Sequence, residues 1–451
     1  MAVSHPPEHP RQAAQATRQA IETVFRMESP RIIAGVTRIV RDVGIAEELA
    51  QDALVAALEQ WPAQGVPDNP GAWLMATARN RAVDLVRRRE RYARKLAEVG
   101  RDLETAPAHA GPLEPPDPDA IDDDLLRLVF IACHPVLSTE ARVALTLRLL
   151  GGLSTAEIAR AMLAPEPTVA QRIVRAKRTL AARAVAFEVP YGPDRAARLG
   201  SVLEVIYLIF NEGYAATAGD DLVRPALCED ALRLARVLTA LMPEESEAHG
   251  LAALLELQAS RTTTRTGPAG EPVLLRDQSR AHWNQMLVRR GFAALARAQA
   301  TAPSPAGALG PYALQAAIAA CHAHAHSYEE TDWQQIAALY GLLAARAPSP
   351  VVELNRAVAV AMAQGTEAGL VLVDALTAEP VLKDYHLLPS VRGDLLERLG
   401  RTDEAHAEFE RAASLARNER ERELLLARAA DCWAGPGRGA RPVESAPCEG
   451  A

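Results

Sequence analysis

Two segments of the chain join helical periodicity to concentrated positive charge, and they constrain the fold more than any other feature. The first spans residues 69–89 and the second residues 152–180. An acidic, proline-rich stretch at 100–124 separates them, where Pro and Asp stop helices and nothing supplies a core. One basic helix is often only a solvated surface. Two in tandem indicate a protein that binds DNA at two places.

The composition favours packed helices over sheets. Only 4% of the residues are aromatic, and 49% are hydrophobic, whereas sheets are enriched in aromatic and β-branched residues. At 451 residues the chain is long enough for two to four domains. The net charge of −8 does not exclude DNA binding, because the acidic excess lies beyond residue 183 and local charge decides nucleic-acid binding. We therefore predict an all-α fold.

The second basic segment has the pattern of a helix-turn-helix. Ser154 is placed to cap a first helix, and Glu157 three residues later completes a capping box. After the turn LAPEP, a second helix should place Val169, Ile173, Val174 and Leu180 against the core. Its polar face carries the candidate DNA-contacting residues Thr168, Gln171, Arg172, Arg175, Lys177 and Arg178. Such a helix fits the major groove, where some side chains reach base edges and others neutralise phosphates.

The first basic segment begins with a helix-start signal. Asn69 or Asp68 can cap the helix, and Pro70 falls in its first turn. Asn80 offers both a donor and an acceptor for a base edge, whereas a lone Trp73 is more often a core residue. The candidate DNA-contacting residues here are Trp73, Arg79, Asn80, Asp84, Arg87 and Arg88. Alone, this segment would fit a charged helix tail, but its pairing with the second segment favours nucleic acid.

No cofactor, metal ion or catalytic activity is predicted. The five cysteines lie far apart without a CxxC pair, so neither a zinc ribbon nor a disulfide framework is indicated and a cytoplasmic location is favoured. We expect no signal peptide and no membrane helix, because no apolar run is long enough. His322 and His326 share a helical face, as metal ligands could, but we interpret them as part of a partly exposed helix end. Glu212 lies in the motif FNEGY and could suggest a catalytic residue. We interpret this motif as a helix end, where Gly213 permits a turn and Tyr214 packs on its neighbours.

Breaks in the helical pattern divide the chain into domains. We predict a first helical domain at 16–97, a linker at 98–124, a second helical domain at 125–189, a helical extension at 194–434 and a disordered tail at 435–451. Residues 1–15 are also expected to be disordered. Within the extension, Gly393, Gly400, Ala405, Phe409 and Ala412 follow the small and large alternation of a tetratricopeptide helix pair, and a looser copy precedes it.

The order of these elements resembles the extracytoplasmic-function group, group IV of the sigma-70 family of bacterial RNA polymerase sigma factors. Residues 46–61 resemble sigma region 2.2, which docks on the polymerase. Residues 69–89 resemble regions 2.3 and 2.4, which melt and read the −10 element, and residues 152–180 resemble region 4.2, which reads the −35 element. The resemblance covers about residues 18–186, and a linker that directly joins the two domains is typical of the group.

The resemblance implies a partner for each candidate site. Core RNA polymerase would bind the polar edge of the helix at 46–61, through Glu48, Gln51 and Asp52. The candidates of the first basic segment would contact the −10 element and those of the second the −35 element. The implied function is a non-enzymatic sigma factor that directs promoter-specific transcription initiation, without contact with a membrane.

The remainder of the chain resembles one subgroup of these sigma factors, which has a long tetratricopeptide-like C-terminal extension and is associated with DGPF/YCII-related proteins. The resemblance implies that the extension regulates or supports activity in cis, with a DGPF/YCII-related protein as a candidate partner. One alternative is a stand-alone helix-turn-helix transcription regulator with a tetratricopeptide sensor domain. Another is an interaction scaffold with a merely basic N-terminal part. The docking helix at 46–61 and the strand-opening segment argue against the stand-alone regulator.

Overall fold

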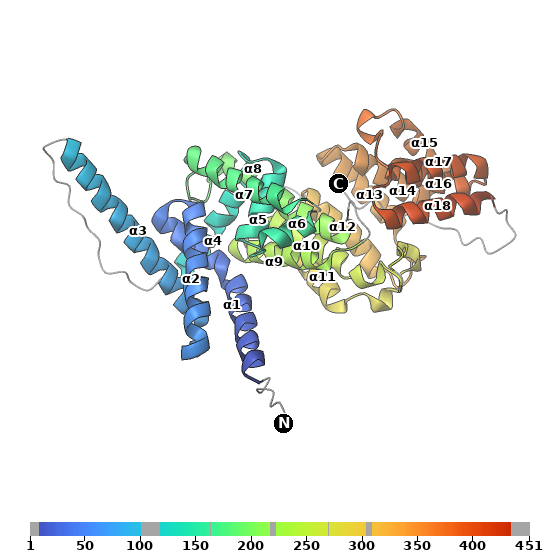
Figure 1. Ribbon diagram of the computed structural model, residues 1–451. Helices are drawn as coiled ribbons and strands as arrows, with labels where there is room; N and C mark the ends of the chain where they lie inside the picture. The colour runs from blue at the N-terminus through green and yellow to red at the C-terminus, as the bar shows by residue number, and fades with distance from the viewer. Residues whose placement is uncertain are drawn as a thin grey trace, which may run out of the picture. The chain divides into compact units, whose positions relative to one another are not determined.

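The computed structural model describes residues 9–100, 118–162, 164–216, 222–268, 270–303 and 309–433. Every regular element among them is a helix (Figure 1), which confirms the all-α prediction. The chain divides into two compact units, and the division falls between Val205 and Ile206, inside one helix. The predicted tail and most of the predicted linker lie outside the described residues.

The first unit begins with three long helices. They are α1 (His9–Val40), α2 (Val43–Gln64) and α3 (Pro70–Gly100). Helix α1 begins within the 1–15 segment that we expected to be disordered, so that expectation was wrong for residues 9–15. Asp42 caps α2 by accepting a hydrogen bond from the backbone N–H of Ile45, and Asn69 caps α3 in the same way through Ala72.

Small residues allow these three helices to pack closely. Ala46, Ala50, Ala53 and Ala57 of α2 are all completely buried, and they recur at the spacing of one helical face. They meet the aliphatic face of α1 and the buried positions of α3, which are Leu74, Ala78 and Ala82. The packing leaves the opposite, charged faces of α2 and α3 in solvent.

Four shorter helices and the beginning of a fifth complete the first unit. They are α4 (Pro118–Ala132), α5 (Thr139–Leu149), α6 (Thr155–Ala161), α7 (Glu166–Ala182) and α8 (Gly192–Tyr214). Helix α4 packs on α1, where the buried carboxylate of Asp124 lies 3.3 Å from Arg38 and 2.7 Å from Arg127.

Hydrogen bonds join the first half of α8 to α4, to α5 and to the residue after α4. The buried guanidinium of Arg142 donates hydrogen bonds to Ser201 and Glu204, the latter at 2.9 Å. Ser201 in turn donates to the carbonyl oxygen of Cys133 at 2.6 Å, and Arg198 donates to the carbonyl oxygen of Phe130 at 3.1 Å. Residues that the sequence assigned to the extension therefore belong to the first compact unit, although the predicted domain boundaries themselves remain predictions.

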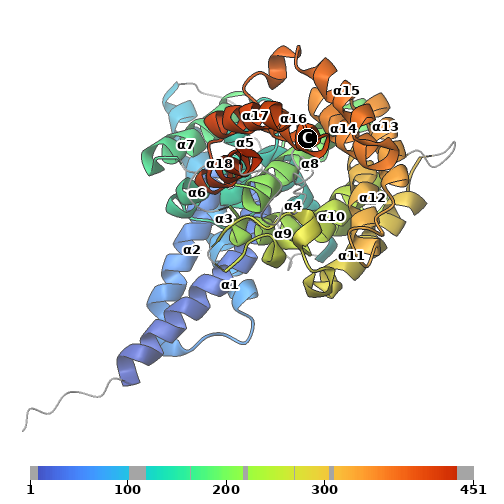
Figure 2. The same cartoon turned by 90° about the vertical axis from the view of Figure 1, so that its right-hand side faces the viewer.

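The second unit continues from the end of α8 through a series of helices (Figure 2). They are α9 (Pro225–Leu241), α10 (Ser246–Ala259), α11 (Gln285–Ala300), α12 (Pro311–His324), α13 (Trp333–Arg346), α14 (Pro350–Gln364), α15 (Thr366–Leu376), α16 (Leu387–Arg398), α17 (Thr402–Leu415) and α18 (Glu419–Trp433). From α12 onward, each helix packs on the next along the chain. This is the arrangement of a helical-repeat protein, in which neighbours supply each other's core.

The small residues of the last helix pairs mark close contacts. A Cβ atom at Gly393 would lie 2.8 Å from the ring of Phe409, so only glycine lets α16 approach α17 this closely. Gly400, with φ of +75°, turns the chain between these two helices. In the preceding pair, a Cβ atom at Gly369 would lie 2.4 Å from the Cβ of Ala361. The contact of Gly393 with Phe409 fits the predicted alternation of small and large residues, whereas Gly369 meets another small residue.

Candidate nucleic-acid interface

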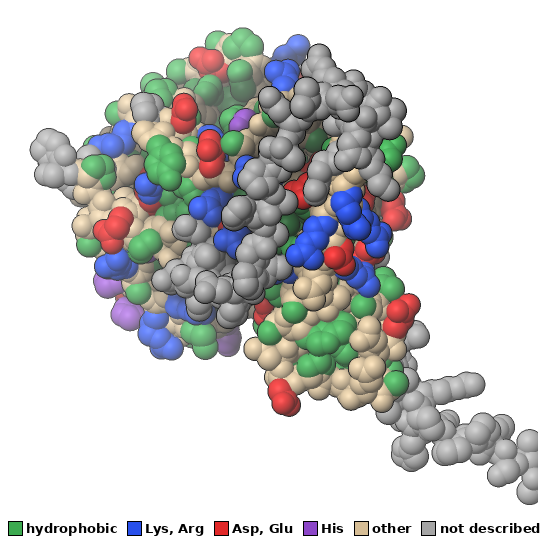
Figure 3. Space-filling model, turned by 90° about the vertical axis from the view of Figure 1, so that its left-hand side faces the viewer, with side chains coloured by type: hydrophobic (Ala, Val, Ile, Leu, Met, Phe, Trp, Pro, Cys, Tyr) green, Lys and Arg blue, Asp and Glu red, His purple; other side chains and the backbone are tan. Residues whose placement is uncertain are grey.

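Helix α3 presents one polar face along its described length. Asn80, Asp84, Arg87 and Arg88 are exposed, and at 3.6 residues per turn they fall on the same side of the helix. Arg91, which the sequence analysis did not select, continues this face and is also exposed. Figure 3, which views the molecule from the side on which α3 ends, shows Lys and Arg side chains gathered into a dense group. The face can neutralise phosphates through its arginines and contact a base edge through Asn80.

The predicted site residue Arg79 and its neighbour Arg81 lie at the two borders of this face. Arg79 and Arg81 are half-buried rather than exposed. The guanidinium of Arg81 lies 3.5 Å from the carboxylate of Asp52 on α2, an exposed ion pair that links the two helices. Because Arg79 is half-buried, it is less accessible to a nucleic acid than the exposed Arg87 and Arg88.

Trp73 lies at the start of the same face, two turns before Asn80. Its ring meets the ring of Trp61 edge to face, with centroids 5.3 Å apart and planes at 70°. Trp61 is buried, whereas Trp73 is only half-buried. Such an aromatic pair holds Trp73 in one orientation and leaves part of its ring accessible for stacking on a base.

The exposed edge of α2 is acidic. Glu48, Asp52 and Glu59 are exposed and lie along one stripe with Val55, whose side chain is 52% exposed. Gln51, also predicted to bind a partner, is half-buried beside this stripe. A stripe of carboxylates around one apolar side chain suits a partner surface that is basic and partly apolar.

The capping box predicted before the helix-turn-helix is present. Ser154 Oγ accepts from the backbone N–H of Glu157 at 3.2 Å, and the Glu157 carboxylate accepts from the backbone N–H of Ser154 at 2.7 Å. The same carboxylate lies 2.8 Å from the guanidinium of Arg26 on α1. Burial alone would raise the pKa of Glu157, but the hydrogen bonds with Ser154 and the charge of Arg26 outweigh it and lower that pKa.

Helix α7 separates its core face from its polar face. Val169, Ile173, Ala176 and Leu180 are buried. Val174, which we expected in the core, is 44% exposed, and Ala176 lies in the core instead. The expectation failed because positions 169, 173, 176 and 180 alone fill the face that α5 covers, and 174 falls outside their arc.

A hollow of about 410 Å³ follows the polar face of α7. Thr168, Gln171, Arg172 and Arg175 line one side, and Ser138 and Glu140 at the start of α5 line the other. The pKa of Glu140 is lowered by hydrogen bonds from the α5 backbone and from Ser138, and also by the charge of Arg172. The sequence analysis missed Ser138 and Glu140, although the order Pro135, Ser138, Glu140 was a visible helix-start signal.

Lys177 and Arg178 depart from this arrangement. Arg178 is exposed but turned toward the side of Val174. The ammonium group of Lys177 instead contacts the buried carboxylate of Glu47 on α2, which also lies 2.5 Å from the Arg148 guanidinium of α5. In this structure Lys177 is therefore not on the face formed by Thr168, Gln171, Arg172 and Arg175.

The histidines near residue 322 do not form a metal site. His322 is buried against Trp333, and burial, followed by the charges of Arg261 and Arg280, lowers its pKa to about 3. His326 lies beyond the end of α12, so the two histidines do not share a helix. Within the described part of the chain, no group of three or more His, Cys, Asp or Glu residues could hold a metal ion.

In the motif FNEGY, Glu212 lies 2.5 Å from Arg224 and the ring of Tyr214 is buried. Gly213 does not form a turn, because it lies inside α8 with an ordinary φ angle. Its role is a close approach: a Cβ atom there would lie 2.7 Å from the backbone nitrogen of Cys228 on α9. Our expectation of a glycine turn was therefore wrong.

Three parts of the chain match known protein families. Residues 24–92 match Sigma-70 region 2, residues 127–180 match Sigma-70, region 4, and residues 198–299 match a family of unknown function, DUF6596. The first two matches contain the polar faces of α3 and α7. No helix among the described residues is long and apolar enough to cross a membrane.

Curated relatives fall into two kinds. Uncharacterized protein R00370 of Rhizobium meliloti (strain 1021) is 42% identical over 398 residues, which cover 87% of this chain and 91% of the relative. ECF RNA polymerase sigma factor SigK of Mycobacterium sp. (strain KMS) is 29% identical over 170 residues, covering 36% and 82%. SigK of Mycobacterium ulcerans (strain Agy99) is 29% identical over 181 residues, covering 38% and 88%. No solved structure matches.

Proposed function

The chain belongs to the family of the R00370 protein and carries sigma-70 regions 2 and 4, and we propose that it is an extracytoplasmic-function sigma factor directing RNA polymerase to specific promoters. The observation that carries this proposal is the pairing of two matched regions, in order, each with an exposed basic helix face. The protein would act as a non-enzymatic subunit. It would bind core polymerase and promoter DNA, while the polymerase catalyses RNA synthesis.

In the proposed initiation complex, α3 contacts the −10 element. Arg87, Arg88 and Arg91 track the phosphates, and Asn80 contacts a base edge. Trp73, already oriented by Trp61, stacks on a base that has left the duplex. A basic surface next to an aromatic ring is what capture of an unpaired strand requires.

Helix α7 contacts the −35 element in the major groove. The residues that line the hollow beside it, Thr168, Gln171, Arg172 and Arg175, supply both hydrogen-bonding groups and positive charge. An arginine can donate two parallel hydrogen bonds to a guanine edge, which gives base discrimination. Thr168 and Gln171 lie nearer the N-terminus of α7, where a recognition helix reaches the bases.

Core polymerase binds the exposed acidic edge of α2, through Glu48, Gln51 and Asp52. Opposite charges on the two surfaces would speed association and fix the register of docking.

The extension supports this activity from within the same chain. Its first helix supplies Ser201 and Glu204, which hold the buried Arg142 of α5 within the first unit. Loss of these residues would leave a buried guanidinium short of partners, which is costly. From the resemblance of the sequence, we also propose a DGPF/YCII-related protein as a partner of the extension.

The proposal is tested by mixing the full-length chain with core RNA polymerase and a library of promoter fragments. We expect co-purification with the polymerase and transcripts that start at a subset of fragments, with permanganate-reactive thymines near the −10 position. The stand-alone regulator would instead bind duplex DNA without polymerase and open no strands. Failure to associate with core polymerase would overturn the proposal.

A further inference from the structure

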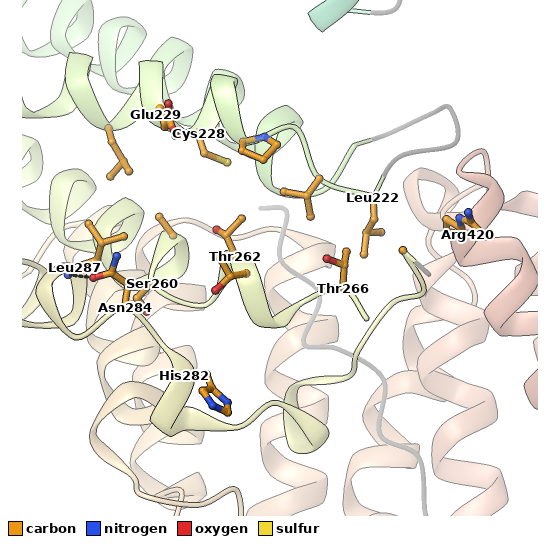
Figure 4. A pocket seen from close by; sticks show the side chains of 16 residues that line it. Leu222, Cys228, Glu229, Ser260, Thr262, Thr266, His282, Asn284, Leu287 and Arg420 are labelled. Carbon is orange, nitrogen blue, oxygen red and sulfur yellow. Dashed lines mark hydrogen bonds between the residues drawn. The ribbon is translucent and has the colours of Figure 1, made fainter. Parts of the chain in front are cut away.

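The segment that follows α10 contributes to two hollows of the second unit. Thr262 lines the larger one, of about 770 Å³, whose charged residues Glu229 and Arg420 lie at opposite ends of it (Figure 4). Arg261 and Arg265 line the smaller one, of about 90 Å³, where charge is concentrated instead. None of the residues proposed to contact DNA or polymerase lines either hollow, so the sigma-factor proposal leaves both unexplained.

The smaller hollow, which we call the arginine cavity, is lined by guanidinium groups from two parts of the chain. They belong to Arg261 and Arg265 after α10 and to Arg428 on α18, and all three residues are buried. Arg428 donates to the carboxylates of Asp394 at 2.6 Å and Glu397 at 2.8 Å. The positive charge in the lining that these two carboxylates do not offset is that of Arg261 and Arg265.

Aromatic rings hold both of these guanidinium groups in place. The Arg265 guanidinium lies 3.8 Å from the centroid of the Tyr214 ring. The Arg261 guanidinium lies 5.8 Å from the same centroid and 5.9 Å from the centroid of the Trp283 ring. The backbone carbonyl of Arg265 also accepts a hydrogen bond from the N–H of Val273 at 2.7 Å. Ring faces attract cations but carry no net negative charge, so they fix the two groups and leave their positive charge in the cavity.

The charge of Arg261 acts on the groups around it. Together with burial, which is the larger cause, it lowers the pKa of Arg280, a buried residue that donates to the carbonyl oxygen of Ser327 and to the hydroxyl group of Thr331. Burial, followed by the charges of Arg261 and Arg280, lowers the pKa of His322 as well. Both shifts point to a positive local potential, which favours an anion.

The remainder of the arginine cavity is mostly apolar. Its apolar lining consists of Leu222, Pro272, Val273, Leu274, Leu387, Leu424 and Leu425. Among the described lining residues, Glu421 is the one carboxylate, and it lies 3.3 Å from the imidazole of His386. A second negative charge on a ligand would meet Glu421. Since a cavity of about 150 Å³ holds benzene, one of about 90 Å³ holds about four non-hydrogen atoms.

We propose that the arginine cavity binds a short-chain carboxylate, a monoanion of the size of acetate or propionate. Its carboxylate accepts hydrogen bonds from Arg261 and Arg265, and its alkyl end packs on the leucine and valine side chains of the lining. A guanidinium carries five N–H donors, so each arginine can donate to the ligand and keep its contacts within the protein. The inference concerns binding alone and does not depend on the proposed role in transcription.

The test uses the full-length protein and four probes, acetate, propionate, propionamide and inorganic phosphate, at an ionic strength held constant with chloride. Calorimetry and thermal shift at millimolar concentrations should detect binding of acetate or propionate. Propionamide has the shape of propionate without its charge and should bind at least about tenfold more weakly, because charge-assisted hydrogen bonds become neutral ones. Phosphate should also bind at least about tenfold more weakly, because its second charge meets Glu421 and its further oxygens meet apolar side chains.

Two variants connect the binding to the arginine cavity. Arg265→Gln should weaken propionate at least about tenfold, whereas the control Arg417→Gln removes the same charge from an exposed position outside the cavity and should leave the affinity unchanged. Because Arg265 is buried against Tyr214, its substitution puts the fold at risk. Val273→Phe therefore tests the same cavity with every charge intact, since the larger ring fills it from a half-buried position and should abolish propionate binding.

Circular dichroism establishes that each variant is folded before its affinity is compared. The proposal is overturned if neither carboxylate binds, if propionamide binds as tightly as propionate, or if phosphate binds more tightly than both carboxylates. It is also overturned if folded Arg265→Gln or folded Val273→Phe binds propionate like the unchanged protein.

Discussion

Arg172 borders the hollow along α7 and is the arginine best placed to be held for a base contact. It is half-buried, and its charge acts on Glu140 across the hollow. Arg172→Ala should reduce the free energy of binding to the cognate −35 element by about 1–3 kcal/mol, the contribution of a bidentate base contact, and transcription from that promoter should fall accordingly. The measurement is transcription in vitro with matched and mutated −35 elements.

The control for this substitution is Arg183→Ala, at the exposed C-terminal cap of α7. Arg183→Ala removes the same charge outside the hollow, so it should affect all promoters slightly and alike. If both variants weaken every promoter equally, Arg172 neutralises phosphates and does not read bases.

Arg88 and Arg89 provide a matched pair on α3. Both are exposed, but Arg88 shares the face of Asn80 whereas Arg89 lies on the opposite side of the helix. Arg88→Ala should reduce strand opening at the −10 element several-fold, as seen by permanganate footprinting, because it removes a phosphate contact to the displaced strand. Equal losses in the two variants would show that only total charge matters.

At the scale of elements, the acidic edge of α2 is proposed to bind polymerase. Charge reversal by Glu48→Lys with Asp52→Lys should weaken association with core polymerase while the melting temperature stays nearly unchanged, since both side chains are exposed. Co-purification measures the association. The control is charge reversal of Asp403 and Glu410 on α17, which changes the net charge equally and should leave the association with core polymerase unchanged. Normal recovery of polymerase with the α2 variant would rule out this docking surface.

The contact between α2 and α7 gives a second prediction at this scale. The carboxylate of Glu47 is buried between Arg148 and Lys177, whereas Glu48 beside it is exposed. Glu47→Gln should lower the free energy of unfolding by about 1–3 kcal/mol, because two partly buried cations lose their counter-charge. Urea denaturation measures this loss. Glu48→Gln is the control and should change stability by less than about 0.5 kcal/mol. Equal values would mean that the Glu47 ion pairs contribute nothing.

At the scale of the whole molecule, the continuous helix α8 makes the start of the extension part of the first unit. A chain that ends at Pro190 should lose transcription activity, because Arg142 loses Ser201 and Glu204. A chain that ends at Val205 keeps these contacts and should have a higher melting temperature than the shorter chain. Transcription by the shorter chain at the full-length rate, in vitro and in cells, would refute the supporting role.

The sequence by itself determined the helical class, the two basic helices, the Asn69 cap of α3 and the capping box of α6. Those features depend on local physics: helical periodicity, a Ser–Glu capping box and Pro in a first turn act within a few residues of one another. The small residue at Gly393 opposite Phe409 could likewise be predicted, because their contact joins two consecutive helices.

Only the tertiary structure decided which neighbour covers each face. Periodicity places Lys177 on a polar arc, but the carboxylate that it contacts comes from α2, more than a hundred residues earlier. The sequence predicts a turn at Gly213, whereas in the structure this glycine allows α9 to lie against α8. One pocket of the second unit is lined by both α9 and the start of α18, two helices distant in the sequence. Burial and contacts between distant segments depend on the packing of the whole unit, and no local pattern encodes them.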